Sequence, residues 1–385
     1  MPRRRILLFS PLAGHDPLGG DTSYTEALLD APPPDVEYST YKDAIADGRV
    51  RVRGRKPWRN PTEGLDATLF SIRLFELGLR RSRVMFREPN WFISVEPGAF
   101  DLVHQHLFSV RQIGGRLPVV SGAGYPLPLL YEAREGWSPR HASLALTAES
   151  LMARALDVHV PWLRATGDGV LTVYGENFRS WLIDRGADPR RVLISGTALP
   201  EIHGLRSRSD GRTLGIIARD FVRKGGDIAL EAFRHLHHDD PTLRLLVVTT
   251  GQNARDHVAP GPGIEVMVDL DREAVLGAAL PRIDILLAPT RSDCGAPYGI
   301  LEALQAGTCV VTSDIPWLDN RLRPPGVRKV EATTDAVVGA VRSIMRDGLP
   351  ASQAAARDLW ESTFTMDALH RALTRAYDLA LEGVQ

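Results

Sequence analysis

Residues 213–236, TLGIIARDFVRKGGDIALEAFRHL, contain the pattern that decides the fold of this chain. The apolar run TLGII predicts a buried strand, and the spacing of apolar residues from Ile228 onwards predicts an amphipathic helix. Arg219, Lys224 and a pair of glycines lie between them. A strand, a glycine-containing loop and a helix in this order form the repeating unit of a parallel α/β sheet. The stretch therefore predicts a doubly wound α/β domain.

The same alternation extends towards both ends of the chain. An apolar run at 6–9 precedes a glycine-rich loop and a helix expected to begin near Ser23. Further short apolar runs predict strands at 100–108, 117–126, 169–177, 191–200, 243–251, 264–270, 283–290 and 308–314. Strands that alternate with helices form parallel sheets covered on both faces, and the pattern restarts near residue 205, so we expect two such sheets.

The restart sets the expected domain boundaries. At 385 residues the chain is long enough for two domains. We expect one Rossmann-like domain over 1–203 and a second over 204–364, joined by the polar segment at 204–211. The spacing of apolar residues also predicts a C-terminal helix over 365–385, and packing back on the N-terminal domain is one arrangement open to it.

The composition limits which partners the protein is expected to bind and in which compartment it is expected. With 46 basic and 47 acidic residues the net charge is -1, so no general attraction to nucleic acid is expected. The chain shows neither a signal-peptide pattern nor an apolar run of the roughly 20 residues that span a membrane, so we expect a cytoplasmic protein. Cys294 and Cys309 are too few for a disulfide framework or a structural zinc site, and both are expected to be free thiols.

One segment departs from the alternation. Residues 49–59, RVRVRGRKPWR, are strongly basic and precede an amphipathic stretch at 65–86. Three interpretations stay open: a solvated loop before a surface helix, a site for an anionic substrate, and peripheral contact with an acidic membrane. The near-neutral charge of the whole chain favours none of them.

Two cations in the opening stretch predict a site for a diphosphate. Arg219 ends a buried strand, and Lys224 follows in the same loop, directly before Gly225 and a helix N-terminus. A guanidinium group can bind two phosphate oxygens, an ammonium group acts as a point charge, and the N–H groups of a helix N-terminus favour anions. The alternative is an ordinary surface lysine before a glycine turn.

A second stretch, RSDCGAPYGILEALQAGTCVV at 291–311, predicts the other half of this site. It follows an apolar strand, and its glycine-containing turn at 295–299 would let the backbone approach a ligand closely. We expect a helix from Ile300, with amides at its start suited to phosphate. Glu302, expected in the first helical turn, could accept two ribose hydroxyls or merely stabilise the helix dipole.

Five segments, in this order along the chain, resemble glycosyltransferase family 4. They are GGDTSYTEALL (19–29), FDLVHQHLF (100–108), VLTVYGENFRSWLIDRGADPRRVLISGTALPE (170–201), RDFVRKGGDIALEAF (219–233) and APTRSDCGAPYGILEALQAGTCVVTSD (288–314). The resemblance implies the GT-B fold, in which two Rossmann-like domains face each other across a cleft. It also implies a retaining enzyme that uses a nucleotide sugar as donor and binds its acceptor on the N-terminal domain.

The resemblance further implies which residues bind the donor. They are Gly19, Gly20, Arg219, Lys224, Cys294, Tyr298, Gly299, Ile300 and Glu302. Within this set, Arg219 and Lys224 would hold the diphosphate and stabilise the leaving nucleotide, Glu302 would bind the ribose, and the amides of 298–300 would bind the distal phosphate. Since these cations and a helix dipole supply positive charge, neither a metal ion nor a cofactor is expected.

Two positions depart from the family's pattern. The family has a carboxylate eight residues before the position of Glu302, and counting places Cys294 there, with Asp293 beside it. Either Asp293 reaches the sugar through a one-residue shift of the turn, or the sugar loses that contact. A reactive Cys294 thiolate is a further alternative, whereas Cys309 is expected in the core. Many members also carry a histidine near the reacting centre, where counting gives Ala123.

Other groups of the N-terminal half are candidates for the missing polar role. The catalytic candidates are Arg219, Lys224, Asp293 and His106, and the acceptor-binding candidates are His15, Asp16, Ala123 and Gly124. We expect His104 to be buried, while His106 and His15 could each be buried or face the cleft. An acceptor that is itself a good nucleophile, such as a thiolate or an amine, would need less help from a protein base.

The sequence thus predicts a glycosyltransferase that moves a sugar from a UDP- or GDP-linked donor to a small-molecule acceptor, in specialised metabolism. A lipid or polysaccharide acceptor is the alternative. Two other classes stay open: a catalytically silent family member that binds a nucleotide sugar, and a sugar-nucleotide epimerase of the same fold. The sequence identifies neither the sugar nor the oligomeric state.

Overall fold

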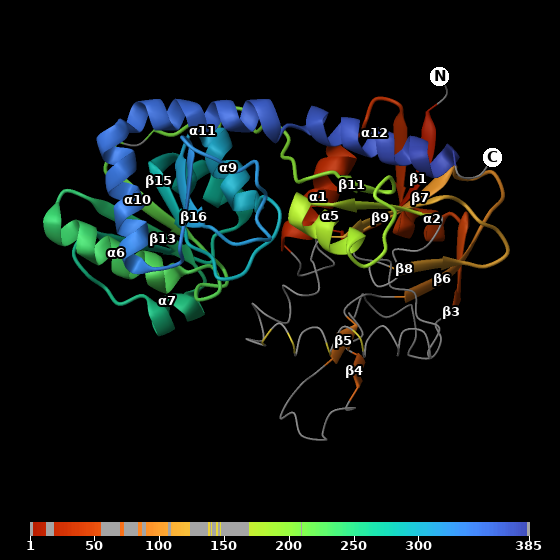
Figure 1. Cartoon of the computed structure of the whole chain (residues 1–385), viewed down its shortest axis with the longest axis horizontal. Coiled ribbons are helices and arrows are strands. Elements are labelled where there is room, and N and C mark those ends of the chain that lie inside the picture. The colour runs from red at the N-terminus through yellow and green to blue at the C-terminus, as the bar shows by residue number, and fades with distance from the viewer. Residues whose placement is uncertain are drawn as a thin grey trace. The chain divides into compact units, whose positions relative to one another are not determined.

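A computed structural model describes residues 3–12, 19–54, 70–72, 84–86, 90–106, 109–123, 138, 140, 144, 147, 169–208 and 210–382. The chain divides into two compact units (Figure 1). The N-terminal unit comprises Met1–Ser195 together with Leu369–Gln385, and the C-terminal unit comprises Gly196–Ala368. The C-terminal unit is therefore inserted, along the chain, into the N-terminal one.

A six-stranded sheet forms the centre of the described part of the N-terminal unit, and its strands are all parallel. In spatial order they are β11 (Val192–Ile194), β10 (Val170–Val173), β9 (Val119–Ala123), β7 (Leu102–His106), β1 (Arg4–Phe9) and β2 (Val36–Thr40). The helices α1 (Gly19–Asp30), α2 (Tyr41–Ala46) and α5 (Glu176–Ile183) accompany it. The four residues that end β1 are buried, as its unbroken apolar run predicts for a parallel sheet.

The basic segment at 49–59 begins as a strand, although a loop was one of the expectations. β3 (Val50–Gly54) pairs antiparallel with β6 (Asn90–Val95), which also pairs with β8 (Ser109–Gln112). In RVRVR the valines and arginines alternate with the period of a strand, so Val50 is buried while Arg51 is exposed. Residues 55–59 lie outside the described part of the chain.

The amphipathic stretch at 65–86 was considered as a surface helix, but the elements described within it are two short strands. β4 (Phe70–Ile72) and β5 (Val84–Phe86) form an antiparallel pair. Both segments consist mostly of β-branched, aromatic or methionine residues, which suit a strand as well as an amphipathic helix.

The C-terminal unit contains a second six-stranded parallel sheet, which confirms the expectation of two α/β sheets. In spatial order its strands are β14 (Ile264–Val268), β13 (Arg244–Thr249), β12 (Thr213–Ile217), β15 (Ile285–Ala288), β16 (Cys309–Ser313) and β17 (Val327–Val330). Its helical segments are α6 (Gly226–Asp239), α7 (Gly251–His257), α8 (Arg272–Ala274), η3 (Val275–Ala279), η4 (Leu280–Arg282), α9 (Tyr298–Ala306), α10 (Thr334–Asp347) and α11 (Leu349–Thr363).

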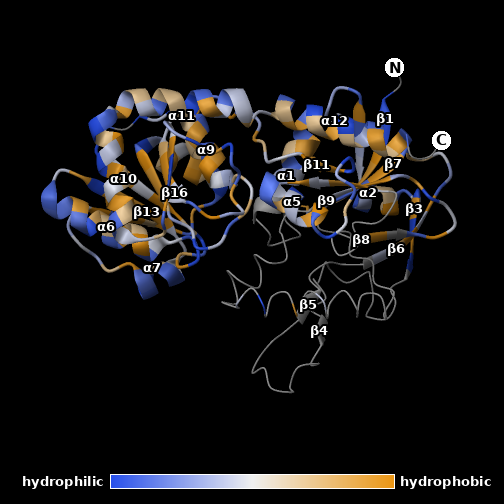
Figure 2. Cartoon of the chain, in the orientation of Figure 1, coloured by the Kyte–Doolittle hydropathy of each residue, from blue (hydrophilic) through white to orange (hydrophobic). Residues whose placement is uncertain are grey.

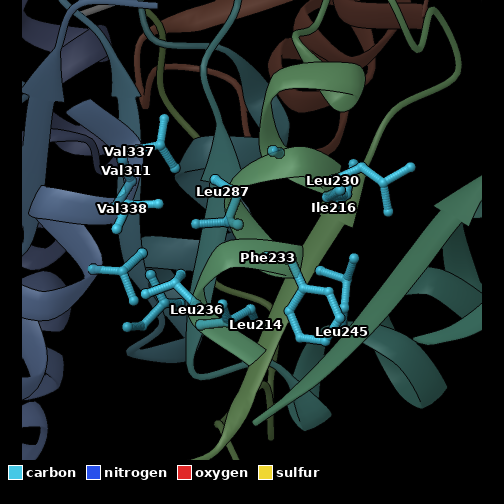
Figure 3. Packing of buried hydrophobic residues seen from close by; sticks show 14 of the residues in the cluster. Leu214, Ile216, Leu230, Phe233, Leu236, Leu245, Leu287, Val311, Val337 and Val338 are labelled. Atoms are coloured by element: carbon cyan, nitrogen blue, oxygen red, sulfur yellow. The ribbon is translucent and has the colours of Figure 1, made fainter. Parts of the chain in front are cut away.

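Both faces of this sheet are covered, because alternate strand residues point to opposite sides. Leu245 and Val247 pack in a cluster with residues of α6 and α10, whereas Leu246 and Val248 pack in a second cluster with residues of α9 and α11. Figure 3 shows Phe233 and other α6 side chains against the first face. In Figure 2, β13 and β16 are hydrophobic while α6 carries both colours, as an amphipathic helix on a buried sheet should.

The last described helix, α12 (Met366–Glu382), contributes to the core of the N-terminal unit. Its Tyr377 is fully buried, and the hydroxyl lies 2.7 Å from the Tyr38 hydroxyl and 2.8 Å from His104 Nδ1. Asp378 pairs with Arg4 of β1 at 2.7 Å. None of the described helices combines the length and apolar character of a membrane span.

Candidate functional site

The strand order of the C-terminal unit fixes where a ligand can bind. β12 is its first strand, and it lies between β13, the second, and β15, the fourth. Connections after β12 and β15 therefore leave on opposite sides of the sheet, and in open α/β sheets such connections flank a ligand-binding crevice beyond the carboxyl ends of the strands. Arg219 and Lys224 follow β12, and Asp293 to Glu302 follow β15. All predicted residues of this unit thus belong to the two connections that flank the crevice.

The two connections touch at Gly225, which precedes α6. Gly225 has φ +73°, a left-handed conformation that favours glycine, and an added Cβ would overlap the carbonyl oxygen of Pro289. Lys224, the residue before it, donates its backbone N–H to Asp220 O at 3.0 Å. This tight turn after β12 brings Lys224 against the loop that follows β15.

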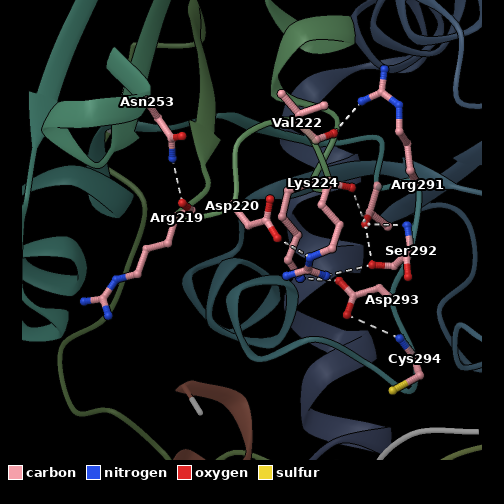
Figure 4. A network of polar contacts seen from close by, with 11 residues as sticks. Arg219, Asp220, Val222, Lys224, Asn253, Arg291, Ser292, Asp293 and Cys294 are labelled. Atoms are coloured by element: carbon pink, nitrogen blue, oxygen red, sulfur yellow. Dashed lines mark hydrogen bonds and ion pairs between the residues drawn. The ribbon is translucent and has the colours of Figure 1, made fainter. Parts of the chain in front are cut away.

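Lys224 forms an ion pair with Asp293 across these loops (Figure 4). The Asp293 side chain is 8% exposed and that of Lys224 is 27% exposed. Oδ1 of Asp293 also accepts the backbone N–H of Cys294 at 3.3 Å, while the pair with Lys224 uses Oδ2. Between the two residues considered for the family's carboxylate, the structure therefore brings Asp293 to the lysine.

Arg219 is separate from that pair. Its side chain is exposed, and in Figure 4 it extends away from Lys224 and Asp293. The amide of Asn253, in α7, donates to Arg219 O at 2.6 Å and so holds its backbone. Within the described part of the chain no residue accepts a hydrogen bond from its guanidinium group. The structure does not join the two predicted cations, and Arg219 keeps its full charge available for a ligand.

Helix α9 begins at Tyr298, two residues before the expected start at Ile300, with Pro297 as its N-cap. Because Pro297 O accepts the Ile300 N–H at 2.9 Å, the Ile300 amide is already engaged, contrary to its predicted role towards phosphate. The Gly299 amide has no acceptor among the described residues, and a Cβ added to Gly299 would meet no atom within 4 Å. The open approach to this helix N-terminus is therefore at Gly299.

Glu302 lies in the second turn of α9 rather than in the first, because the helix starts earlier than expected. Its side chain is only 12% exposed, and Arg272 of α8 forms an ion pair with it at 3.0 Å. Burial raises the pKa of Glu302, and Arg272 opposes that rise. Sequence reasoning missed Arg272, because nothing in the segment around it indicates a partner in another helix.

The two cysteines occupy different surroundings. Cys309 on β16 is fully buried in the core that α6 and α10 cover, as expected, and burial raises the pKa of its thiol to about 12. Cys294 is partly buried in the loop beside Asp293, and neither cysteine forms a disulfide. Because Cys309 is buried and its thiol stays protonated, it contributes only to packing of the core.

The histidines of the N-terminal unit lie in its interior. His104 is fully buried, and burial, with a smaller effect of His106, lowers its pKa to about 3, so it is neutral near pH 7. His106 is also fully buried; its Nε2 lies 3.1 Å from the Tyr174 hydroxyl, and a Cβ on Gly122 would lie 2.6 Å from its Nδ1. This packing gives His106 a place in the core and does not support its predicted catalytic contact with substrate.

The remaining N-terminal candidates flank the described elements. Gly19 and Gly20 are the first residues of α1, and Ala123 is the last residue of β9. His15, Asp16 and Gly124 lie outside the described residues. In the N-terminal sheet the chain order reverses between β1 and β7, so the carboxyl end of β1 lies at a switch point of its own.

Comparison with known proteins connects this geometry to a group of enzymes. Residues 211–347 match the family model of glycosyl transferases group 1. D-inositol 3-phosphate glycosyltransferase of Geodermatophilus obscurus is 26% identical over 262 residues, which is 59% of this chain and 55% of that protein. The chain thus spans about half the length of this curated relative. The matched segment of the family model contains both connections of the crevice.

Solved structures resemble the whole chain. Sucrose-phosphate synthase from Thermosynechococcus elongatus has a TM-score of 0.61 at 16% identity, with 98% of each chain covered. Anabaena HepE, solved with UDP-glucose, has a TM-score of 0.54 at 11% identity, over 97% of this chain and 98% of HepE. A glycosyltransferase from Rickettsia africae has a TM-score of 0.56 at 13% identity, over 99% and 100%. At such identities the likeness concerns the fold, and this chain has the two-unit parallel α/β architecture of GT-B structures.

Proposed function

We propose that this protein is a glycosyltransferase that transfers a sugar from a nucleoside-diphosphate sugar to an acceptor. The observation that carries the proposal is the grouping of Arg219, Lys224, the N-terminus of α9 and Glu302 on the connections that leave β12 and β15. The match of residues 211–347 to glycosyl transferases group 1 supports it, since that segment contains all four features.

The charges of this site suit a leaving diphosphate. In the described structure Asp293 neutralises Lys224, whereas the guanidinium group of Arg219 has no described acceptor, so the site carries net positive charge before a ligand arrives. The arginine can bind two phosphate oxygens, and the Gly299 amide adds a donor at a helix N-terminus. As the bond between sugar and phosphate breaks, negative charge grows on the leaving oxygen, and these fixed donors stabilise it.

Asp293 has a second role in this proposal. An incoming phosphate competes with its carboxylate for Lys224, and an Asp293 released from the lysine could then accept a hydroxyl of the donor sugar. This would let Asp293 take the place of the carboxylate that the family has at the position of Cys294. Transfer with retained configuration, in which the leaving phosphate takes the acceptor proton, needs no protein base.

The finer assignments are a uridine- or guanosine-linked donor and a small-molecule acceptor bound by the N-terminal unit. Uridine is favoured because HepE, which shares the fold, was solved with UDP-glucose. A small polar acceptor is favoured because the curated relative is named for D-inositol 3-phosphate. We carry both features to this chain as part of the proposal.

Thermal stabilisation by nucleotides tests the donor site. The melting temperature would be measured with UDP, GDP, TDP and ADP at millimolar concentration, for the unaltered protein and for Arg219→Ala. Arg219 is the appropriate substitution because its exposed side chain supports no described contact. We expect one nucleotide to raise the melting temperature and the variant to lose that rise. If none of the nucleotides shifts the transition, the proposal is wrong.

Product analysis separates transfer from the alternative activities. The preferred sugar nucleotide would be incubated with and without a panel of acceptors that includes inositol phosphates, thiols and amines. We expect nucleotide release together with a glycosylated acceptor, and only when an acceptor is present. An altered sugar nucleotide without any acceptor would indicate an epimerase, and binding without turnover would indicate a silent protein.

A further inference from the structure

We propose that Arg272 is a positioning residue that holds Oε1 of Glu302 and leaves Oε2 for a ribose hydroxyl of the bound nucleotide. The inference rests on the proposed function, in which Glu302 binds the donor ribose, and assigns a residue that the sequence did not indicate. It predicts that Arg272, without contacting the sugar itself, sets how strongly the site prefers ribonucleotides.

The contact is one-sided. Nε of Arg272 donates to Oε1 of Glu302 at 3.0 Å, and Nη2 lies 3.0 Å from the same oxygen. Among the described residues, Oε2 has no hydrogen-bond or ion-pair partner. When only one oxygen of a largely buried carboxylate is hydrogen-bonded, the other oxygen can still accept a hydrogen bond from a ligand.

Other arginine–carboxylate pairs of the same unit engage either one oxygen or both, and those with one oxygen, such as Arg244–Asp210 and Arg342–Asp239, involve aspartates that are 51% and 53% exposed. Arg291 binds Asp227 through both oxygens, at 2.6 and 2.7 Å. Arg282 binds Glu265 through both oxygens, at 2.9 and 2.5 Å. Both are the two-pronged arrangement that suits the planar guanidinium group best. Arg272 departs from it although Glu302 is the most buried of the three carboxylates, at 12% against 44% and 53% exposed.

The geometry of α9 places open space next to the unused oxygen. Glu302 and Gly299 are three residues apart and so lie on the same face of the helix. Helical side chains lean towards the N-terminus, which directs Glu302 over the turn that contains Gly299. Because an added Cβ at Gly299 would meet nothing within 4 Å, a nucleotide whose phosphate binds at this N-terminus has room for its ribose beside Glu302.

The backbone that carries Arg272 is fixed by a helix cap. Arg272 is the first residue of α8, and Oδ1 of Asp271, the N-cap, accepts the Ala274 N–H at 2.8 Å. Burial alone would favour the protonated form of Glu302 and raise its pKa, while the arginine charge favours the ionised form. The ion pair therefore opposes protonation of Glu302 and orients its carboxylate, and both effects favour recognition of a hydroxyl.

The test measures the preference for ribose rather than affinity alone. Dissociation constants would be determined by calorimetry for UDP and GDP and for their 2′-deoxy and 3′-deoxy counterparts. For the unaltered protein we expect the ribonucleotide to bind about tenfold more tightly than at least one deoxy form. Arg272→Gln and Glu302→Gln should each reduce this ratio to about one, and the double variant should reduce it no further. Arg272→Lys, which retains a charged donor, should keep part of it.

Arg282→Gln is the matched control, because it removes an exposed arginine from an ion pair of the same unit and should leave the ratio unchanged. If Arg272→Gln weakens ribo and deoxy forms equally, Arg272 has only a structural role and the inference is wrong. The inference also fails if the unaltered protein binds a nucleotide without ribose preference. If the unaltered protein binds no nucleotide, the proposed function fails first, so the two failures are distinguishable.

Discussion

Lys224 and Arg219 are proposed to bind the same diphosphate, yet they differ in what they contribute to the folded protein. Lys224 pairs with a largely buried aspartate, whereas Arg219 is exposed and has no described side-chain partner. Removal of one partner from a buried pair leaves an uncompensated charge, and removal of an exposed side chain without contacts costs little. The two cations can therefore be separated by measuring stability and binding together.

Lys224→Ala should lower the free energy of unfolding by about 1–3 kcal/mol, because Asp293 keeps a buried carboxylate without its partner. Arg219→Ala should change it by no more than about 0.5 kcal/mol. Both should weaken nucleotide binding by at least about tenfold. Urea unfolding and calorimetry would measure the two effects.

Lys224→Met combined with Asp293→Asn is the control, and it should recover most of the stability without restoring nucleotide binding. A Lys224→Ala protein of full stability would contradict the ion pair.

Among the individual site residues, the two cations could be predicted because they lie between a strand and a helix N-terminus. It also named Asp293 as the alternative to Cys294, and the structure brings that carboxylate to Lys224. Arg272 could not be predicted, because its partner Glu302 is 30 residues away and only the folded structure brings the two side chains together. The sequence leaves the role of His106 ambiguous. A histidine on a central strand looks the same in the sequence whether its side chain faces a substrate cleft or is packed in the core.

The elements that shape the site are short connections, and two glycines in them have opposite requirements. Gly225 is in a left-handed conformation against the Pro289 carbonyl, so a side chain there conflicts with the turn itself. Gly299 lies in the first turn of α9 with free space beyond it. One glycine serves the fold, and the other serves access to the helix N-terminus.

Gly225→Ala should therefore destabilise the protein by about 1–3 kcal/mol, since the turn must shift to remove the overlap with Pro289. Gly299→Ala should leave the melting temperature unchanged or slightly raised, because alanine favours a helix, but should weaken nucleotide binding several-fold by narrowing the approach. Thermal unfolding and calorimetry on both variants would decide. Equal stability of Gly225→Ala and the unaltered protein would show that the two loops do not depend on that contact.

Most strands of the two sheets were predictable, because buried parallel strands are unbroken apolar runs, such as residues 6–9. β2 and β17 were not predicted, because their short segments mix apolar with polar or charged residues. The first and last residues of the helices and strands were less predictable. Helix α9 starts at Tyr298 because Pro297 caps it, and a proline that precedes a helix by one position is easily taken as part of the turn. In RVRVR the high charge suggests a solvated loop, whereas the alternation of valine and arginine is that of a strand.

At the scale of the molecule, α12 ties residues 369–382 to the sheet of the N-terminal unit through Tyr377. Its hydroxyl joins Tyr38 and a neutral His104 in one buried chain of polar contacts. From the sequence alone, the apolar face of this helix was clear, but the surface that it covers was not, because hydrophobic spacing does not specify a partner.

His104 should make the protein less stable in acid. Its pKa in the folded protein is about 3, below the ordinary 6.5, so between these values the unfolded chain binds a proton that the folded one does not. The stability that it contributes is complete above pH 6.5 and is lost at up to about 1.4 kcal/mol per pH unit as the pH falls. Urea unfolding at pH 7.5, 6.0 and 5.0 should show a shallower decline for His104→Gln than for the unaltered protein.

Replacement of the exposed His203 by glutamine is the control, and it should retain the unaltered decline. Tyr377→Phe should lower stability by about 1–3 kcal/mol at every pH, because Tyr38 and His104 both lose a buried partner. An identical pH dependence for His104→Gln and the unaltered protein would contradict the burial of a neutral histidine.

The insertion of the C-terminal unit into the N-terminal one also bears on synthesis. A ribosome completes residues 196–368 before it reaches 369–382, so the unit with the proposed donor site has its whole sequence while the other still lacks the helix that carries Tyr377. Domains begin to fold as they emerge, commonly in order from the N-terminus. In this protein the later-starting unit can be the first to finish, and a chain truncated after residue 368 should already bind nucleotide.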